Sequence, residues 1–171
     1  MTRRFFPFIL LLSAIAVVKG GSWANSTFIP RISFDYVSAT WSSSTICVIV
    51  GNSASRTGAI LRTTNSGSSW ADVTQSTVNP YLLSDIAHVS FDDIPYYIVT
   101  GSSNGGFVFT SSDGVTFSAA KPVSLSGLNG VTIGSNGAAY AVGLGGYIYR
   151  STFGSAWNDW TDISPTSKVI K

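Results

Sequence analysis

The side chains best suited to acid–base chemistry in this sequence are eight aspartates, because the chain contains no glutamate. Asp92 and Asp93 form the only adjacent acidic pair, and paired carboxylates are what glycoside hydrolysis requires. Neighbouring residues of an extended strand point to opposite faces, so this pair would not face one substrate. We predict instead a solvated hairpin turn ahead of Ile94 and Pro95.

Two other reactive residue types occur once each. Cys47 lies in the apolar run 46–50, which predicts a buried, inert side chain; a reactive or intermolecular thiol would need exposure and a nearby base. His88 is the single histidine, so a metal site built on histidine would lack a second imidazole. With no nucleophile elbow, phosphate loop or metal-ligand spacing, we expect no catalytic, cofactor-binding or metal-binding residues and no cofactor.

The composition favours an all-β domain. The chain has 171 residues, enough for one domain with a core; 13% of them are aromatic, 11% are charged, and glycine and proline number 17 and 6. This mixture is poor in helix formers and rich in strand and turn residues. It excludes a helical bundle or a coiled coil, and the apolar fraction excludes disorder.

The N-terminus has the layout of a secretory signal peptide. A basic start at 1–4 precedes the largely apolar stretch 5–18 and the small residues around Ala24. As a helix, that stretch would span about 21 Å, short of the ~30 Å hydrocarbon core, so a spanning anchor is the weaker alternative. We predict a signal peptide over 1–24, with cleavage after Ala24, Gly20 or Ala16, and a linker over 25–30.

Cleavage would change the charge balance and the location of the protein. It removes three of the ten basic residues, Arg3, Arg4 and Lys19, leaving seven against eight acidic residues. No basic footprint for nucleic acid then survives, and no membrane attachment is expected. We predict a secreted protein or, as an alternative, one in a lumenal compartment. Asn25 opens a sequon and is a candidate N-glycosylation site.

Three segments repeat one pattern, which indicates an array of similar units. In each, a glycine closes an apolar run, a second glycine opens another, and an aromatic residue follows a polar turn. The first glycines are Gly51, Gly101 and Gly143, spaced 50 and 42 residues apart. The aromatic anchors are Trp70, Phe117 and Trp157, spaced 47 and 40 apart.

Each repeat is predicted to hold four short strands in a meander. The central runs are 46–50, 96–100 and 138–142, the next strands are 59–63, 107–111 and 147–151, and weaker apolar stretches precede them at 32–37, 83–89 and 128–133. Four antiparallel strands in about 45 residues are typical of a β-propeller blade. We predict an all-β partial β-propeller over 31–171 with about three four-stranded antiparallel blades, at about 31–74, 75–121 and 122–164. A β-sandwich would explain the strands but not the repeat.

The turns between third and fourth strands resemble the Asp box, Ser/Thr-x-Asp-x-Gly-x-Thr-Trp, of BNR or sialidase-like propellers. Segment 63–70 carries Asn65 in place of Asp, and segment 111–117 carries Phe in place of Trp and is one residue shorter. Segment 151–157 is degenerate, with Phe153 where Asp belongs. The flanks, with Val-Gly before and Leu-Arg-Thr-Thr leading in, look most like the photosystem II stability/assembly factor type of propeller.

We expect the residues of these turns to be structural. An Asp or Asn side chain accepts N–H bonds within its own turn, the glycines take positive φ, and the aromatic anchors pack between adjacent blades. The predicted turn residues are Thr63, Asn65, Gly67 and Trp70 in the first repeat, Ser111, Asp113, Gly114 and Phe117 in the second, and Ser151, Gly154 and Trp157 in the third.

The resemblance to sialidases implies an arginine triad, a tyrosine nucleophile and a glutamate, and the last is missing. Arg62 and Arg150 occupy equivalent repeat positions, which favours a repeat feature over a triad. We therefore predict a protein that is not an enzyme: a secreted, non-catalytic module or fragment that binds a protein or glycan. The alternative is a fragment of a secreted sialidase-like or other glycoside hydrolase whose catalytic residues lie in missing blades.

Three blades are fewer than the 4–8 of closed propellers. A truncated product or fragment, a natural short form, or self-association through the open blade edges would each account for this, and we favour a fragment. Open blades expose sheet edges and apolar faces.

Overall fold

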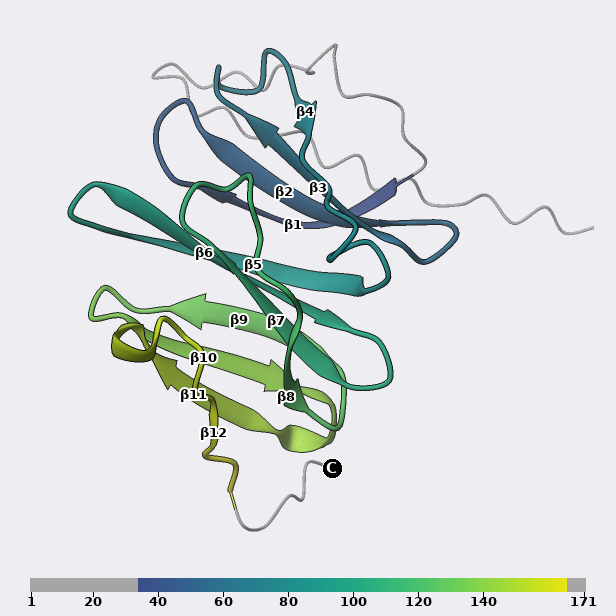
Figure 1. Cartoon of the computed structure of the whole chain (residues 1–171), viewed down its shortest axis with the longest axis vertical. Coiled ribbons are helices and arrows are strands. Elements are labelled where there is room, and N and C mark those ends of the chain that lie inside the picture. Colours follow the sequence, from purple (N-terminus) through teal and green to yellow (C-terminus); the bar gives the residue numbers. More distant parts are fainter. Residues whose placement is uncertain (1–33, 166–171) are drawn as a thin grey trace, which may run out of the picture.

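The chain forms three antiparallel sheets of four strands each, in a computed structural model that describes residues 34–165 (Figure 1). The first sheet contains β1 (Phe34–Trp41), β2 (Cys47–Ser53), β3 (Gly58–Thr63) and β4 (Ala71–Asp72). The second contains β5 (Leu82–Phe91), β6 (Ile94–Ser102), β7 (Gly106–Ser111) and β8 (Lys121–Ser124). The third contains β9 (Leu128–Ile133), β10 (Ala138–Gly143), β11 (Ile148–Thr152) and β12 (Thr161–Asp162). Short 3-10 turns, η1 (Leu144–Gly146) and η2 (Phe153–Ser155), flank β11.

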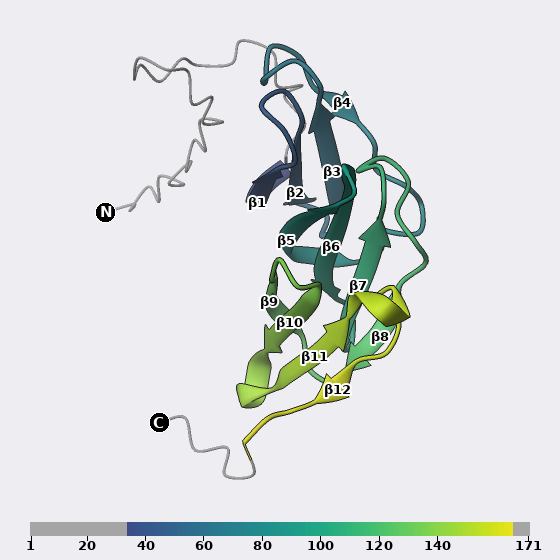
Figure 2. The same ribbon diagram turned by 90° about the vertical axis from the view of Figure 1, so that its left-hand side faces the viewer.

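Within each sheet the strands follow chain order, so each sheet is a meander. The three sheets succeed one another along an arc, with β1, β5 and β9 on one side (Figure 2). The structure is therefore a partial β-propeller of three blades, as the repeat predicts.

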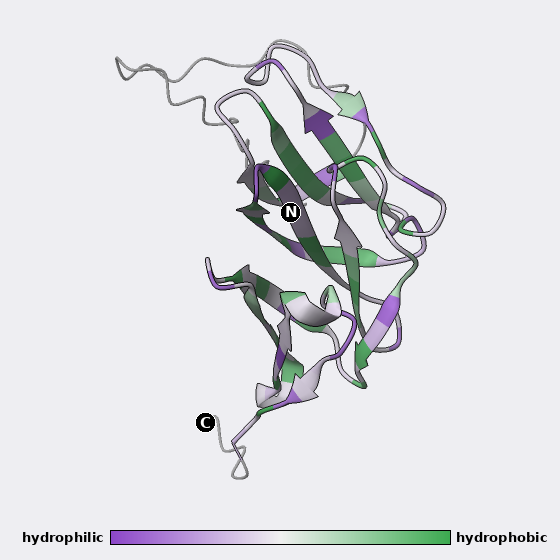
Figure 3. Ribbon diagram, turned by 60° about the vertical axis from the view of Figure 1, so that its left-hand side comes forward, coloured by the Kyte–Doolittle hydropathy of each residue, from purple (hydrophilic) through white to green (hydrophobic). Residues whose placement is uncertain are grey.

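Two apolar cores fill the spaces between neighbouring blades. In β6, Tyr97 and Val99 face the first blade, whereas Ile98 faces the third, because successive side chains of a strand alternate between faces. The first core joins Val48, Val50 and Ile60 to Tyr97, Val99 and Phe109. The second joins Ile98 and Val108 to Ala139, Ala141 and Tyr149. Both faces of β2 and of β6 are buried, which explains their continuous apolar runs (Figure 3).

Polar side chains of β2 and β5 also tie neighbouring blades together. The Asn52 amide donates to Leu83 O and accepts from Leu83 N, both at 2.7 Å, and so pairs with β5 as a strand would. Ser84 Oγ donates to Leu128 O at 2.7 Å, from the second blade to the third. These bonds satisfy backbone groups beside the register shift between Leu83 and Asp85.

The limits of the blades differ in detail from those expected. The boundary expected after residue 121 falls inside β8, which pairs with β7 and belongs to the second blade. Phe117 does not open that strand; it is buried in the first core, and its N–H donates to Gln75 Oε1 at 3.0 Å. The segment around Phe117 therefore packs into the first core before the chain rejoins the sheet as β8. Between residues 34 and 165, no helix is long and apolar enough to cross a membrane.

Candidate functional site: a pocket between the second and third blades

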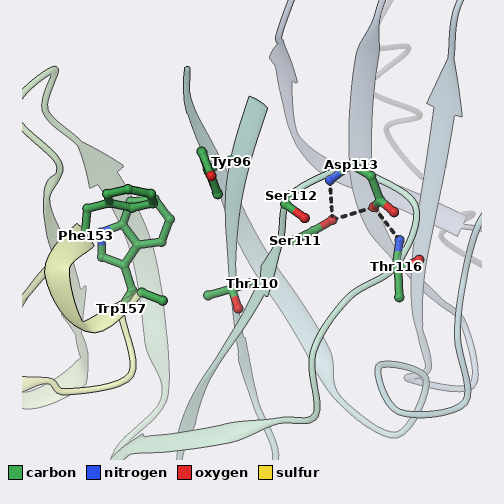
Figure 4. A pocket seen from close by; sticks show the side chains of 9 residues that line it. Tyr96, Thr110, Ser111, Ser112, Asp113, Thr116, Phe153 and Trp157 are labelled. Carbon is green, nitrogen blue, oxygen red and sulfur yellow. Dashed lines mark hydrogen bonds between the residues drawn. The ribbon is translucent and has the colours of Figure 1, made fainter. Parts of the chain in front are cut away.

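A pocket of about 470 Å³ lies where the turn after β7 approaches η2 of the third blade. Its walls differ in chemistry, as Figure 4 shows. Hydroxyl groups and a carboxylate line one side, from Ser111, Ser112, Asp113 and Thr116. Aromatic rings line the other, from Tyr96, Phe153 and Trp157, with Thr110 between the two walls and Ala156 completing the lining. The volume falls in the range of small-ligand sites.

The polar wall is a turn held by its own side chains. Ser111 Oγ donates to Asp113 Oδ1 at 2.9 Å and accepts from Gly114 N at 2.9 Å. Asp113 Oδ1 also accepts from the N–H groups of Val115 and Thr116, each at 2.7 Å. The turn therefore holds its carboxylate in one place.

Asp113 is ionised at neutral pH. Burial alone would raise the pKa of its carboxyl, but the hydrogen bonds from Thr116, Val115 and Ser111 outweigh burial and lower the pKa. Of the residues that line the pocket, Asp113 is the only one with a charged side chain, so the lining carries a net negative charge.

The aromatic wall is a cluster in which each ring supports the next. The Phe153 ring centroid lies 4.8 Å from that of Tyr96 and 5.1 Å from that of Trp157, and Phe91 packs 4.6 Å behind Phe153. The Trp157 indole N–H donates to Gly137 O at 3.0 Å. Because Trp157 is buried and bonded, its ring is fixed before any ligand arrives.

The turn of the first repeat has the same arrangement around Asn65. Thr63 Oγ1 donates to Asn65 Oδ1 at 2.9 Å and accepts from Gly67 N at 3.0 Å. Asn65 Oδ1 accepts from Ser69 N at 2.9 Å. An amide thus holds this turn where a carboxylate holds the turn of the second repeat.

The aromatic anchors are all buried, but they occupy two kinds of place. Phe117 lies in the core between the first two blades and Trp157 in the core between the last two. Trp70 does not lie between two described blades, contrary to expectation. It packs with Cys47, Ile49 and Leu61 on the other face of the first blade. Phe117 and Trp157 each cover the face of their own blade that is turned toward the preceding blade, and Trp70 lies on the face of the first blade that is turned away from the second.

The third turn departs from the prediction for its glycine. Gly67 and Gly114 have φ of 85° and 68°, as expected, but Gly154 is not among the residues with positive φ in the described part of the chain. It lies in η2, and the positive φ values fall instead on Ala156 and Trp157, at 49° and 55°. Ser151 Oγ meets Ser155 Oγ at 3.5 Å, since no carboxylate or amide is available at residue 153.

The other chemically interesting residues do not assemble into a catalytic site. Asp92 and Asp93 form the exposed two-residue hairpin between β5 and β6, with φ of 48° and 62°, which confirms the predicted turn. Cys47 is buried, and burial raises the pKa of its thiol to about 12. Burial also lowers the pKa of His88, whose Nε2 lies 3.0 Å from Ser90 Oγ. Across residues 34–165, no group of three or more His, Cys, Asp or Glu side chains is placed to hold a metal ion.

Arg62 and Arg150 hold equivalent positions in β3 and β11, opposite Val48 and Tyr140 of the neighbouring strands. They lie in different blades and are a repeat feature, so they do not converge on one point. Asn25 and the expected signal peptide and linker, residues 1–30, lie outside the described residues.

The third blade also presents an apolar face that no described blade covers. Tyr140 and Val142 are 37% and 45% exposed, and Leu144 and Ile163 are 58% and 45% exposed. The matching positions of β2, Val48 and Val50, are fully buried against the second blade. This face therefore has the composition of an interface between blades.

The comparisons with known proteins agree with the fold. No protein-family model and no curated protein matches the sequence. A solved structure of YCF48 bound to a D1 peptide matches with a TM-score of 0.61 and 15% identity, over 77% of this chain and 42% of that one. YCF48 from Cyanidioschyzon merolae matches with a TM-score of 0.59 and 19% identity, over 78% and 41%.

Both neighbours are β-propellers, so the expected likeness to the photosystem II assembly-factor type is confirmed at the level of the fold. The chain spans about two-fifths of the length of these structures.

The sequence identifies residues of both walls of the pocket but does not show that the two walls meet. Ser111 and Asp113 were predicted as turn residues, and Trp157 as a core anchor. Tyr96, Thr116 and Phe153 had no assigned role. The available signal was topological: in a meander, the turns after β7 and β11 come at the same end of their blades, beside one another.

Proposed function

We propose that the chain is a non-catalytic propeller module that binds a segment of a protein partner in the pocket between the second and third blades. The observation that carries this proposal is the pairing of a fixed aromatic wall with a wall of hydroxyls and one carboxylate. Peptide sites combine apolar burial with a few placed polar groups in this way. One solved neighbour, YCF48, is bound to a D1 peptide, which shows that a propeller of this type can take a peptide ligand.

We expect no glycoside hydrolysis in this pocket. The pocket offers a single carboxylate, Asp113, and hydrolysis of a glycoside needs two acting together. A glycan is the second candidate ligand, because aromatic faces opposite hydroxyls suit a sugar ring as well as a peptide side chain. We expect no turnover of a sialoside or a β-glucan in either case.

The test is selection from a random-peptide library on the full chain, followed by binding measurements on the selected peptides. Ser112→Trp fills the pocket from an exposed position and should weaken binding by about tenfold or more. Ser103→Trp is the matched control, since Ser103 is exposed in the hairpin at the opposite end of β7 and should bind as the parent does. Equal loss in both variants, or glycan-array binding without peptide binding, would overturn the proposal.

We also propose that the protein is secreted and that it associates with a second copy of itself. The composition of residues 1–24 supports removal on secretion, which N-terminal sequencing should show as a start near Asn25 or Gly21. The apolar face of Tyr140, Val142, Leu144 and Ile163 supports association with a second copy of the chain.

A further inference from the structure

We infer that the pocket between the second and third blades selects an arginine side chain of the partner peptide. This inference rests on the proposed function and names the group that the pocket would recognise. It starts from the charge of the lining, in which Asp113 is the only charged residue and no lysine, arginine or histidine takes part.

The Asp113 carboxylate is already organised for a cation. Its Oδ1 accepts the Ser111 hydroxyl and two backbone N–H groups, which hold it in the turn and keep it ionised. Since these bonds lie within one short segment, no rearrangement is needed when a ligand binds. A fixed anion in the lining of a pocket favours a positive group over a neutral or negative one.

The opposite wall suits the planar shape of a guanidinium. The rings of Tyr96 and Phe153 are half-buried and meet edge to face, with centroids 4.8 Å apart, so part of each remains open to the cavity. Arginine stacks on aromatic faces and at the same time donates to carboxylates and hydroxyls. Lysine would reach the carboxylate but would use the rings less well.

The hydroxyls complete the set of acceptors. Ser112 and Thr116 lie on the same wall as Asp113 and are exposed, so their side chains can accept the N–H groups that the carboxylate leaves unused. A guanidinium group carries five N–H donors and no acceptor. The polar wall can accept hydrogen bonds from its edge, and the aromatic rings can stack on its planar face.

The first repeat supplies a variant that removes the charge and keeps the turn. Asn65 Oδ1 accepts the Thr63 hydroxyl and the N–H of Ser69, much as Asp113 Oδ1 accepts the Ser111 hydroxyl and the N–H groups of Val115 and Thr116. Asp113→Asn should therefore fold and hold its turn while the pocket becomes neutral. Asp35→Asn is the matched loss of charge at an exposed position on β1.

The experiment measures binding of a library-selected peptide and of its versions with lysine, citrulline or glutamate in place of arginine. Citrulline keeps the shape of arginine without its charge. We expect citrulline to weaken binding to the parent chain by about five- to tenfold and lysine to bind less tightly than arginine. Asp113→Asn should weaken the arginine peptide by a similar factor and leave the citrulline peptide unchanged, and Asp35→Asn should change neither.

Two results separate this inference from the proposal beneath it. If selected peptides bind and Ser112→Trp blocks them, yet citrulline and arginine bind equally, the arginine inference is wrong and the peptide site stands. If no peptide binds at all, the proposed function itself fails.

Discussion

Asp85 of β5 and Val131 of β9 are joined across the second and third blades: the Val131 N–H donates to Asp85 Oδ2 at 2.9 Å. The other carboxylate oxygen, Oδ1, accepts the Ser38 hydroxyl of β1 at 2.6 Å and the N–H of Ile86 at 2.9 Å. One side chain thus connects all three blades at their innermost strands. The register shift between Leu83 and Asp85 turns this side chain away from the β5 ladder and makes the connection available.

Removing this carboxylate should loosen the whole array. Asp85→Ala leaves the Val131 N–H and the Ser38 hydroxyl without their acceptor, at an expected cost of about 2–4 kcal/mol in the free energy of unfolding. Asp85→Asn keeps one acceptor oxygen and should lose about half as much. Urea unfolding measures the free energy of unfolding of both variants. Asp35→Ala, at an exposed position of β1, is the control and should stay within about 0.5 kcal/mol of the parent. Equal effects at Asp85 and Asp35 would contradict the inter-blade role.

Gly114 and Gly154 hold equivalent places in the sequences of their turns, but an added methyl group should destabilise the chain at Gly114 and have little effect at Gly154. At Gly114, φ is 68° and an added Cβ would lie 3.0 Å from the Tyr97 ring and 3.1 Å from Val48. Gly114→Ala should therefore cost about 2 kcal/mol or more. A Cβ on Gly154 meets nothing within 4 Å, so Gly154→Ala should stay within about 0.5 kcal/mol of the parent. Thermal unfolding of the two variants side by side gives the comparison, and a larger loss at Gly154 would refute it.

The turn around Asp113 predicts a dependence of stability on pH. Its pKa in the folded chain is lowered, so its stabilisation is complete above the unfolded value of about 3.9 and is lost as pH falls through the folded pKa. The free-energy difference between the parent and Asp113→Asn should therefore change as the pH drops from about 5 towards 3 and be constant above that range. Parallel curves over the whole range would show that the carboxylate contributes nothing through its charge.

The open face of the third blade predicts association. Val142→Lys introduces a charge into the apolar face that includes Tyr140, Leu144 and Ile163. In sedimentation over a series of concentrations, we expect the parent chain to associate and the variant to remain monomeric to a higher concentration. Val115→Lys, at a similarly exposed valine on the second blade, should leave the distribution unchanged. A parent chain that remains monomeric at every concentration would remove the proposed second copy.

Much of this architecture follows from the order of residues along the chain. The glycine and aromatic spacings locate three units, and the stretch predicted at 128–133 matches β9 residue for residue. These features are local, since strand propensity, turn glycines and alternation act over a few residues.

The errors come from contacts between blades. The sequence does not show that η2 takes over the turn at Gly154, or that Trp70 covers a face with no described neighbour. The pocket was missed for the same reason: residues 111–116 and Phe153 become one site only when the second and third blades pack together.

The measurement that most directly tests the binding site is a titration of the isotope-labelled chain with a library-selected peptide, followed by amide resonances in NMR spectra. The proposed site predicts that the resonances of Ser112, Asp113 and Thr116 shift progressively with peptide, whereas those of Ser103 and Asn104, at the other end of β7, stay in place. Shifts confined to the hairpin at 103–104 or to the inner strands, with the pocket resonances unmoved, would contradict the account.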